Sequence, residues 1–395
     1  MHLGRGLVVL ALTAGISGCE QNPTLPTPPP APPSFLTFGA VSPGDEHTCG
    51  ITTDGSAYCW GDNVDGQLGN GTAADWVKPA RVAAGGGLHF MSVDAGFRHT
   101  CAITTDGAAY CWGHGGEGEL GDGTGSDHAV PTAVASTMRF TGISASFVHS
   151  CGLVGGGGRV GALYCWGQNG YGQLGDGTTS TRASPVAVSG GLTFATATTG
   201  YVHTCGVTTV GAAYCWGQNS GGQLGDSTTT DRSSPVAVLG GLTFVTVRAG
   251  YFHTCGITTQ GAVYCWGDNR SGQLGNGTTV NEPGPVAVQG GLKFLTISAG
   301  NATTCGVTMD FAPYCWGRNS HGELGDGTTI DRSTPTLVDT QVPGGISVFV
   351  LSSGGGHTCF ITGAYAAYCW GENLHGQVGD GTKTDRDAPV RVAPQ

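Results

Sequence analysis

The sequence predicts an all-β fold: a seven-bladed β-propeller with four antiparallel strands and one disulfide within a hairpin of each blade. Three observations predict it. Fourteen of the 15 cysteines form seven pairs, and the first cysteines of successive pairs lie 50 to 54 residues apart, a period typical of propellers. The chain holds 73 glycines and only 11% charged residues, a share well below about 25% in ordinary domains. No unit contains an apolar pattern of helical period.

Residues 1–18 are predicted to be a signal peptide. His2 and Arg5 form a short polar start, residues 7–12 an apolar run, and Gly18 precedes Cys19. This pattern resembles the bacterial lipoprotein signal, in which the cysteine is lipidated and becomes the first mature residue. We expect Cys19 to be a lipid anchor in the cell envelope, at the outer membrane or the cell surface. An ordinary signal peptide or a cytoplasmic N-terminus is the alternative.

Residues 19–34 are predicted to be a stalk that follows the anchor. Seven prolines lie between residues 20 and 34. At about 3.1 Å per residue in polyproline II, this segment holds the next domain up to roughly 45 Å from the membrane. A proline-rich ligand for a recognition domain is the alternative. Residues 35–395 are expected to form the propeller.

Each repeat unit contains four extended stretches separated by glycine-rich turns. In the fifth unit these are residues 243–247, 255–258, 263–266 and 286–288. Four short antiparallel strands per unit, repeated seven times, are typical of a propeller. Because the chain begins with a first-strand segment and ends with a fourth-strand segment at residues 389–392, we expect the last segment to complete the N-terminal blade and close the ring.

The paired cysteines are predicted to form cross-strand disulfides. Cys49 and Cys59 are centred on Asp54, so a three-residue turn at residues 53–55 places them opposite each other on the second and third strands. An exported protein meets the oxidising conditions that disulfides need. Zinc is the alternative, but short metal-site spacings are missing from the sequence. The expected pairs are Cys49–Cys59, Cys101–Cys111, Cys151–Cys165, Cys205–Cys215, Cys255–Cys265, Cys305–Cys315 and Cys359–Cys369.

The turn between the paired cysteines differs among the repeats. Gly55 stands at its left-handed position, and glycine recurs at 107, 211 and 261. The third repeat lengthens the turn with the glycines at 155–158, while the sixth and seventh place Phe311 and Tyr365 there.

A tryptophan and a histidine recur at fixed strand positions. Trp60 and its six counterparts favour packing between adjacent blades over ligand stacking. His47 recurs as His99, His149, His203, His253 and His357, with Thr303 in the sixth copy. Ligands of one zinc ion lie within about 3.5 Å of each other, so this ring cannot share one ion. A hydrogen bond from each histidine to a neighbouring loop is the simpler interpretation.

The repeat unit resembles the regulator of chromosome condensation family over about residues 37–393. It reads Ala-Gly-x-x-His-[Thr/Ser], then Tyr-x-Trp-Gly-x-Asn-x-x-Gly-Gln-Leu-Gly, then Asp-Arg-x-x-Pro-Val. The resemblance implies a seven-bladed propeller, and a secreted bacterial β-lactamase inhibitory protein is similar in fold. The founding member exchanges guanine nucleotide on a nuclear GTPase, but this chain lacks a wedge-like insertion and adds the cysteine pair. Kelch repeats, also propellers, are the alternative.

Composition and motifs exclude several chemistries. The net charge of -11 with lysine only at 78, 293 and 383 argues against nucleic acid. The Gly-Asp-Gly-Thr segments, such as Asp176, lack the alternating ligands of a calcium loop and are typical of turns. We expect no metal, no cofactor and no catalytic residue. The Asp-Arg pairs at 231–232, 331–332 and 385–386 are expected to be loop ion pairs.

One face of the disc is predicted to bind a partner. Loops between strands one and two and between strands three and four must emerge on the same side, and they vary in aromatic residues and arginine, the composition of interface anchors. The opposite face is expected to show mainly Thr, Asp and Gly turns. The alternative is that the aromatics lie between blades. The predicted binding residues are Phe97, Arg98, Phe147, Tyr171, Tyr201, Tyr251, Phe252, Arg270, His321 and His375.

These features predict a monomeric, non-catalytic binding or scaffold protein that is displayed outside the cytoplasm and recognises an extracellular protein or polymer. The membrane is expected to be contacted through the N-terminal lipid alone. An exchange-factor-like regulator, implied by the family, and an unrecognised propeller hydrolase are the alternatives. Fold by itself does not choose between them.

Overall fold

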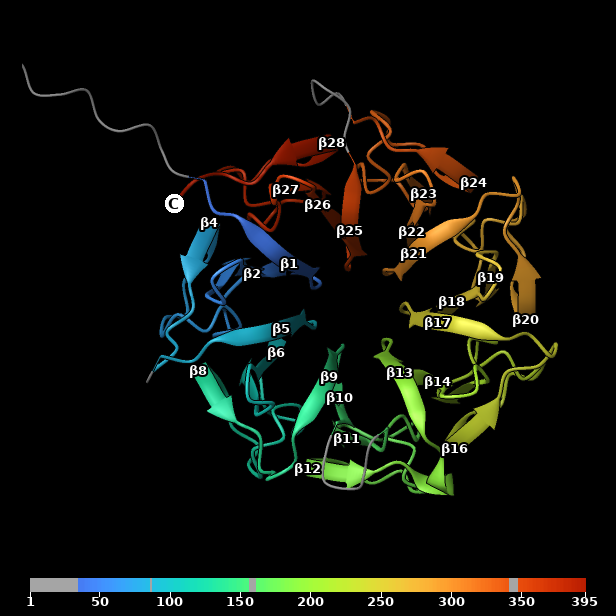
Figure 1. Ribbon diagram of the computed structural model, residues 1–395, viewed down its shortest axis with the longest axis horizontal. Helices are drawn as coiled ribbons and strands as arrows, with labels where there is room; N and C mark the ends of the chain where they lie inside the picture. The colour runs from blue at the N-terminus through green and yellow to red at the C-terminus, as the bar shows by residue number, and fades with distance from the viewer. Residues whose placement is uncertain (1–34, 86, 156–160, 341–346) are drawn as a thin grey trace, which may run out of the picture. The chain divides into compact units, whose positions relative to one another are not determined.

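The computed structural model describes residues 35–85, 87–155, 161–340 and 347–395, which form seven four-stranded antiparallel sheets arranged as a ring (Figure 1). The predicted signal peptide, Cys19 and the stalk lie outside the described residues, as do residues 156–160 in the third hairpin turn. The fold class predicted from the sequence is confirmed, with one disulfide in every sheet.

The four strand positions of a blade recur with nearly constant lengths. The first strands are β1 (Phe38–Pro43), β5 (Phe90–Ala95), β9 (Phe140–Ala145), β13 (Phe194–Thr199), β17 (Phe244–Ala249), β21 (Phe294–Ala299) and β25 (Val348–Ser353). The second strands are β2 (His47–Thr52), β6 (His99–Thr104), β10 (His149–Val154), β14 (His203–Thr208), β18 (His253–Thr258), β22 (Thr303–Thr308) and β26 (His357–Thr362).

The outer half of each blade is made by the other two positions. The third strands are β3 (Ala57–Gly61), β7 (Ala109–Gly113), β11 (Leu163–Gly167), β15 (Ala213–Gly217), β19 (Val263–Gly267), β23 (Pro313–Gly317) and β27 (Ala367–Gly371). The fourth strands are β4 (Trp76–Arg81), β8 (His128–Ala133), β12 (Arg182–Ala187), β16 (Arg232–Ala237), β20 (Glu282–Ala287), β24 (Arg332–Leu337) and β28 (Arg386–Arg391). A short 3-10 turn, η1 (Ser189–Gly191), follows β12.

Burial follows the radial order of the strands. The first strands face the centre of the ring and the fourth strands lie at its periphery (Figure 1). All six residues of β2 are buried, because its two faces pack against both neighbouring blades, whereas β20 is only partly covered. Proline in the fourth strand is tolerated because an edge strand leaves one side of its backbone unpaired. That strand begins earlier than predicted in the fifth unit, at Glu282 rather than residue 286.

Adjacent blades pack through the recurring tryptophan, as predicted. Trp112 is completely buried and lies against Cys59 and Leu68 of the preceding blade. Its indole Nε1 donates a 2.9 Å hydrogen bond to the backbone oxygen of Gln67. A Cβ on Gly69 would lie 2.6 Å from that indole nitrogen. Glycine is therefore required where this loop of the preceding blade crosses the indole of Trp112.

The predicted ring closure by a shared blade is wrong. β1 pairs with β2, and β28 pairs with β27, so every sheet coincides with one sequence repeat. The seam between the last and first blades has the same contacts as the six remaining blade boundaries. The Phe38 amide donates to the backbone oxygen of Tyr365 at 2.9 Å. Trp60 Nε1 donates to the backbone oxygen of Gln377, also at 2.9 Å.

Candidate functional site

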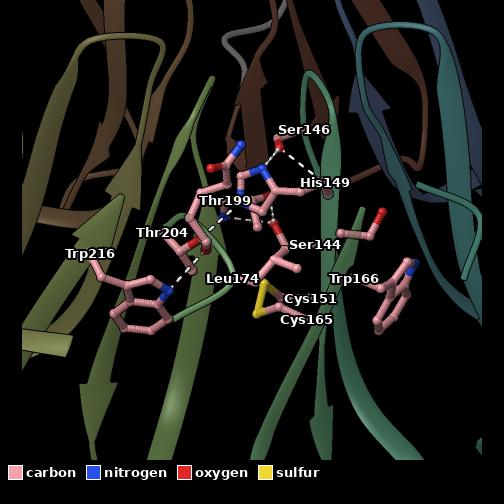
Figure 2. Close-up of a disulfide and its surroundings, with 12 residues drawn as sticks. Ser144, Ser146, His149, Cys151, Cys165, Trp166, Leu174, Thr199, Thr204 and Trp216 are labelled. Carbon is pink, nitrogen blue, oxygen red and sulfur yellow. Dashed lines mark hydrogen bonds between the residues drawn. A yellow bond between two sulfur atoms is a disulfide. The ribbon is translucent and has the colours of Figure 1, made fainter. Parts of the chain in front are cut away.

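The recurring histidines join each blade to the next one. At the boundary between the third and fourth blades, shown in Figure 2, His149 Nε2 lies 2.8 Å from Thr204 Oγ1. The same hydroxyl donates to the backbone oxygen of Gln173 at 2.8 Å. A hydroxyl has one hydrogen, so it must accept from the imidazole Nε2–H, which fixes the tautomer.

The same contact recurs at five further blade boundaries. The expected acceptor was a neighbouring loop, but the acceptor is a hydroxyl on the second strand of the next blade. The pairs are His47–Thr100, His99–Ser150, His203–Thr254, His253–Thr304 and His357–Thr48. Burial lowers the pKa of each of the six ring histidines to about 3. The ring is therefore neutral and structural. In the sixth blade Thr303 Oγ1 instead donates to the backbone oxygen of Arg318 at 3.0 Å.

A cavity of about 440 Å³ occupies the centre of the ring and is lined by the first strand of every blade. The fifth residue of those strands is a serine or threonine in five blades, but Asp94 in β5 and Arg248 in β17. Asp94 accepts from Ser42 Oγ and from the amide of Ala145, each at 2.9 Å. Burial raises the pKa of Asp94 and lowers the pKa of Arg248. Sequence reasoning missed this pair, although its break in the repeat pattern was visible.

One mouth of the cavity carries the aromatic arc, which we define as Phe97, Phe147, Tyr201, Tyr251 and Phe252. Ring centroids lie 4.3 Å apart for Phe97 and Phe147 and 3.8 Å apart for Phe147 and Tyr201. Tyr201 continues to Tyr251 at 5.0 Å and to Phe252 at 5.3 Å. The arc is half-buried, and its rings contact one another across the boundaries between neighbouring blades.

A polar contact ties the arc back to the first blade. The Tyr251 hydroxyl donates a short hydrogen bond to the Asp45 carboxylate. Burial raises the pKa of Asp45 to about 6, although the bond from Tyr251 acts in the opposite direction. Tyr251 is thus held in place by the fold.

Of the remaining predicted binding residues, Arg98 shares a loop with Phe97, and the others lie on loops between the third and fourth strands of their blades. The Arg98 guanidinium carbon sits 5.5 Å from the Phe97 ring centroid, and Tyr171 is 43% exposed. Arg270 Nε pairs with Asp268 at 3.0 Å, and His321 Nδ1 with Asp385 at 2.9 Å. Arg270 and His321 are therefore held by carboxylates, and neither makes a ring contact with the aromatic arc among the described residues.

A histidine and carboxylate cluster surrounds His375, the last predicted binding residue. Its Nδ1 lies 3.6 Å from an oxygen of Asp62 and 3.6 Å from an oxygen of Asp75. A second cluster of the same composition surrounds His114, which the sequence analysis did not single out. Burial raises the pKa of the nearby Glu119 to about 7. The loop-bearing face therefore has an aromatic part over the second to fifth blades and an acidic part over the seventh, first and second.

The Gly-Asp-Gly-Thr segments are turns, and their Asp-Arg partners differ from the predicted ones. Arg182 binds Asp176 with its Nε and Nη2, at 3.1 and 2.9 Å, and Arg232, Arg332 and Arg386 bind Asp226, Asp326 and Asp380 in the same way. The adjacent aspartates, such as Asp231, instead accept from a backbone amide, here that of Asn219 at 2.8 Å. The predicted pairs of sequence neighbours are therefore wrong, because each arginine reaches six residues back.

The opposite face also carries apolar side chains, contrary to the prediction that it shows mainly Thr, Asp and Gly. Phe311 and Phe349 lie with ring centroids 5.4 Å apart, and Phe349 is 54% exposed. Five of the other repeats carry glycine at the position of Phe311, and all of them carry a smaller residue at the position of Phe349. The described residues contain no helix that is long and apolar enough to cross a membrane.

Comparison with known proteins identifies the repeats. The model of the RCC1-like domain matches residues 135–395, and models of the regulator of chromosome condensation repeat match residues 40–67, 92–119, 54–103 and 106–153. The chain is 37% identical over 150 residues to the ultraviolet-B receptor UVR8 of Arabidopsis thaliana, covering 38% of this chain and 33% of UVR8. It is 33% identical over 157 residues to human HERC4, a probable E3 ubiquitin-protein ligase, covering 39% of this chain and 15% of HERC4. The matches thus span a third or less of these relatives.

Solved structures agree in fold at low sequence identity. Human WBSCR16 superposes with a TM-score of 0.77 at 19% identity, covering 86% of this chain and 94% of that one. Yeast RCC1 (Prp20), solved bound to Kap60, superposes with a TM-score of 0.73 at 18% identity, covering 96% and 91%. The resemblance to a secreted β-lactamase inhibitory protein stays a prediction.

Proposed function

The chain belongs to the family of RCC1-like domains, and on that premise we propose that it is a non-catalytic binding propeller that recognises a protein outside the cytoplasm through its loop-bearing face. Relatives of this fold bind proteins: a structure of yeast Prp20 is described together with its binding to Gsp1p and histones, and another is a complex with Kap60. An extracellular polymer is the alternative ligand.

The aromatic arc is the observation that carries the proposal. Five aromatic rings from four consecutive blades form one continuous series of ring contacts at the cavity mouth, with the exposed Tyr171 near Tyr201. Aromatic side chains supply large contact area at a low entropic cost and dominate interface hot spots. Because the rings already hold one another, little order has to be gained when a partner docks.

A double substitution tests this docking surface. Tyr171→Ala with Phe252→Ala removes two aromatic rings from the loop-bearing face but keeps the Tyr251 contact with Asp45. With a partner identified by cross-linking and mass spectrometry of the intact envelope, we expect this variant to weaken affinity by about 30-fold, since hot spots contribute about 2 kcal/mol or more. The measurement is isothermal titration calorimetry.

Phe349→Ala is the matched control, because Phe349 is a similarly exposed aromatic residue on the opposite face. It should leave the affinity unchanged. If the Tyr171→Ala, Phe252→Ala variant binds the partner as tightly as the wild type and Phe349→Ala binds it more weakly, the binding site lies on the opposite face and this proposal is refuted.

The proposed location depends on Cys19. We expect Cys19→Ser to move the protein from the membrane fraction to the soluble envelope fraction, because the thiol that would carry the lipid is removed. Cell fractionation with immunoblotting measures this. Retention of the variant in the membrane fraction would contradict lipid anchoring.

A further inference from the structure

Two equivalent clusters on the acidic part of the loop-bearing face stand at neighbouring blade boundaries. One joins His375 of the seventh blade to Asp62 and Asp75 of the first, and the other joins Asp65 of the first blade to His114 and Asp127 of the second. The positions correspond: His375 and Asp65 occupy the same place in the repeat, as do Asp62 and His114, and Asp75 and Asp127. The histidine and one aspartate have exchanged places between the two boundaries, yet each cluster has one imidazole and two carboxylates.

The His375 cluster points an imidazole nitrogen at two carboxylates. Nδ1 lies 3.6 Å from Asp62 Oδ1 and 3.6 Å from Asp75 Oδ2. This nitrogen is buried and has no hydrogen-bond partner among the described residues. On the other side of the ring, Nε2 lies 3.8 Å from Glu46 Oε1.

The His114 cluster repeats this arrangement with different residues. Nδ1 lies 3.2 Å from Asp127 Oδ1 and 4.0 Å from Asp65 Oδ1, and it too is buried without a hydrogen-bond partner in the described part of the chain. Nε2 lies 3.7 Å from Glu119 Oε1. Glu119 is only 1% exposed, and its Oε1 is likewise buried and unpartnered among the described residues. The other oxygen, Oε2, accepts from the amide of Glu117 at 2.8 Å. A buried oxygen without a partner is costly, so the orientation of Oε1 toward the imidazole needs an explanation.

The spacing and the charge of both clusters match a divalent metal ion. Two ligands of a tetrahedral zinc ion with bonds of about 2.0–2.1 Å lie about 3.4 Å apart. The distances from the imidazole to the carboxylates are 3.6 and 3.6 Å in the first cluster and 3.2 and 4.0 Å in the second, and all ligand atoms of a cluster lie within 4.8 Å of one another. A metal-ligating histidine typically donates its other ring N–H to a carboxylate, the place taken by Glu46 and Glu119. With Glu46 or Glu119 added, three carboxyl groups surround each imidazole. One cation lies nearby in each case: Lys383 Nζ is 3.0 Å from Asp75 Oδ2, and Arg98 Nε is 3.5 Å from Asp65 Oδ2.

We propose that the His375, Asp62 and Asp75 cluster and the His114, Asp65 and Asp127 cluster each bind a divalent first-row transition-metal ion, with zinc as the best fit. Imidazole and carboxylate ligands suit such ions. Each ion joins two neighbouring blades, and the two ions flank the first blade, including the seam where no peptide bond connects the seventh blade to the first. The expectation of no metal rested on the ring histidines, the cysteines and the Gly-Asp-Gly-Thr turns, none of which takes part here.

Zinc binding to the purified full-length protein tests the proposal. After removal of metal with EDTA, calorimetric titration with zinc chloride should show two equivalents bound to the wild type. His375→Ala and His114→Ala should each bind one, and the double variant none. Zinc should raise the melting temperature of the wild type and leave that of the double variant unchanged.

His321→Ala is the matched control, because His321 lies at the next boundary of the same face but bonds Asp385 directly at 2.9 Å; it should keep two zinc ions. Asp75→Asn keeps the size of the side chain and should also remove one ion, which separates ligand loss from misfolding. Glu119→Gln should weaken the second site by about 10- to 100-fold. Absence of bound zinc in the wild type would overturn the proposal, and so would two ions in the double variant.

Discussion

At the residue scale, a buried polar side chain and its partner in the same loop change together from repeat to repeat. The glutamine of the Gly-Gln-Leu-Gly motif illustrates this. Gln273 Nε2 donates to Asp268 at 2.8 Å. Where glutamate replaces glutamine, the partner becomes basic: Glu119 faces His114 and Glu323 pairs with Arg318 at 3.2 Å. The substitutions occur in complementary pairs because a buried carboxylate needs a donor or a cation.

The neutral histidine ring makes the fold sensitive to acid. The pKa of His203 is about 3 in the folded protein, well below its ordinary value of 6.5. Between these values the unfolded chain binds the proton and the folded chain does not, so stability falls as the pH falls from about 6.5 toward 3. Each buried histidine contributes a slope of about 1.4 kcal/mol per pH unit in this window.

His203→Thr tests this effect, because Thr303 shows that threonine is accommodated at the same position. At pH 7 the substitution should cost about 1–3 kcal/mol, since the ring contact is lost. As the pH falls from 6 to 4, however, the free energy of unfolding should decrease less steeply in the variant than in the wild type. The two slopes should differ by about 1.4 kcal/mol per pH unit, the contribution of one buried histidine. Urea unfolding at a series of pH values measures both. An identical slope in the two proteins would contradict a neutral His203, and His89→Thr at an exposed position is the control.

At the element scale, the hairpin that carries the disulfide depends on one left-handed residue. Five repeats place glycine there, with φ of 84° at Gly55 and 76° at Gly261. The sixth and seventh repeats place Phe311 and Tyr365 in the same conformation, with φ of 64° and 59°. The turn geometry predicted from Gly55 therefore holds even where its sequence signal is missing, because the paired strands and the disulfide impose it.

Tyr365→Gly should stabilise the protein. A side chain in the left-handed region costs about 1–2 kcal/mol, and the added freedom of glycine in the unfolded chain offsets part of this. We expect a net gain of about 0.5–1 kcal/mol in the free energy of unfolding, measured by urea denaturation, because the Tyr365 ring is largely exposed and loses little packing.

The reverse change at an equivalent turn is the control for that gain. Gly211 has φ of 84°, and a Cβ there would lie 2.5 Å from Thr243 Cγ2, so Gly211→Ala should destabilise by about 1 kcal/mol or more. A loss of stability in Tyr365→Gly would show that the turn is unstrained or that the ring contributes packing.

At the scale of the whole molecule, the ring closes with side chains and loop backbone instead of a shared sheet. At the seam, Thr48 Oγ1 donates to the backbone oxygen of Gln377 at 2.7 Å, and the amide of Gly355 donates to Gly44 at 2.9 Å. These are the contacts of the other boundaries, so the seam is as well bonded as a connected interface. The same geometry gathers loops of all seven blades on one face.

The sequence alone determined the number of blades, the strand order, the disulfide pairs and the packing role of the tryptophans. All of these follow from local rules repeated seven times: cysteines equidistant from a turn face each other, and a residue recurring in every copy must contact the same neighbour in every copy. The predicted sides of the loops followed from strand order in the same way.

Only the tertiary structure decided what happens between blades and between parts of the ring that lie far apart in sequence. The structure of the seam depends on whether β28 or β4 completes the first sheet. Both are fourth strands of the repeat with the same sequence pattern, so the sequence does not choose between them. The central Asp94 and Arg248 lie in different blades, and the cluster that joins His375 to Asp62 and Asp75 spans over 300 residues. The contacts among the aromatic residues from Phe97 to Phe252 likewise depend on how the curvature of the propeller brings the loops of neighbouring blades together. Local patterns specify each blade, whereas these sites depend on distances across the closed ring, which the repeat pattern does not encode.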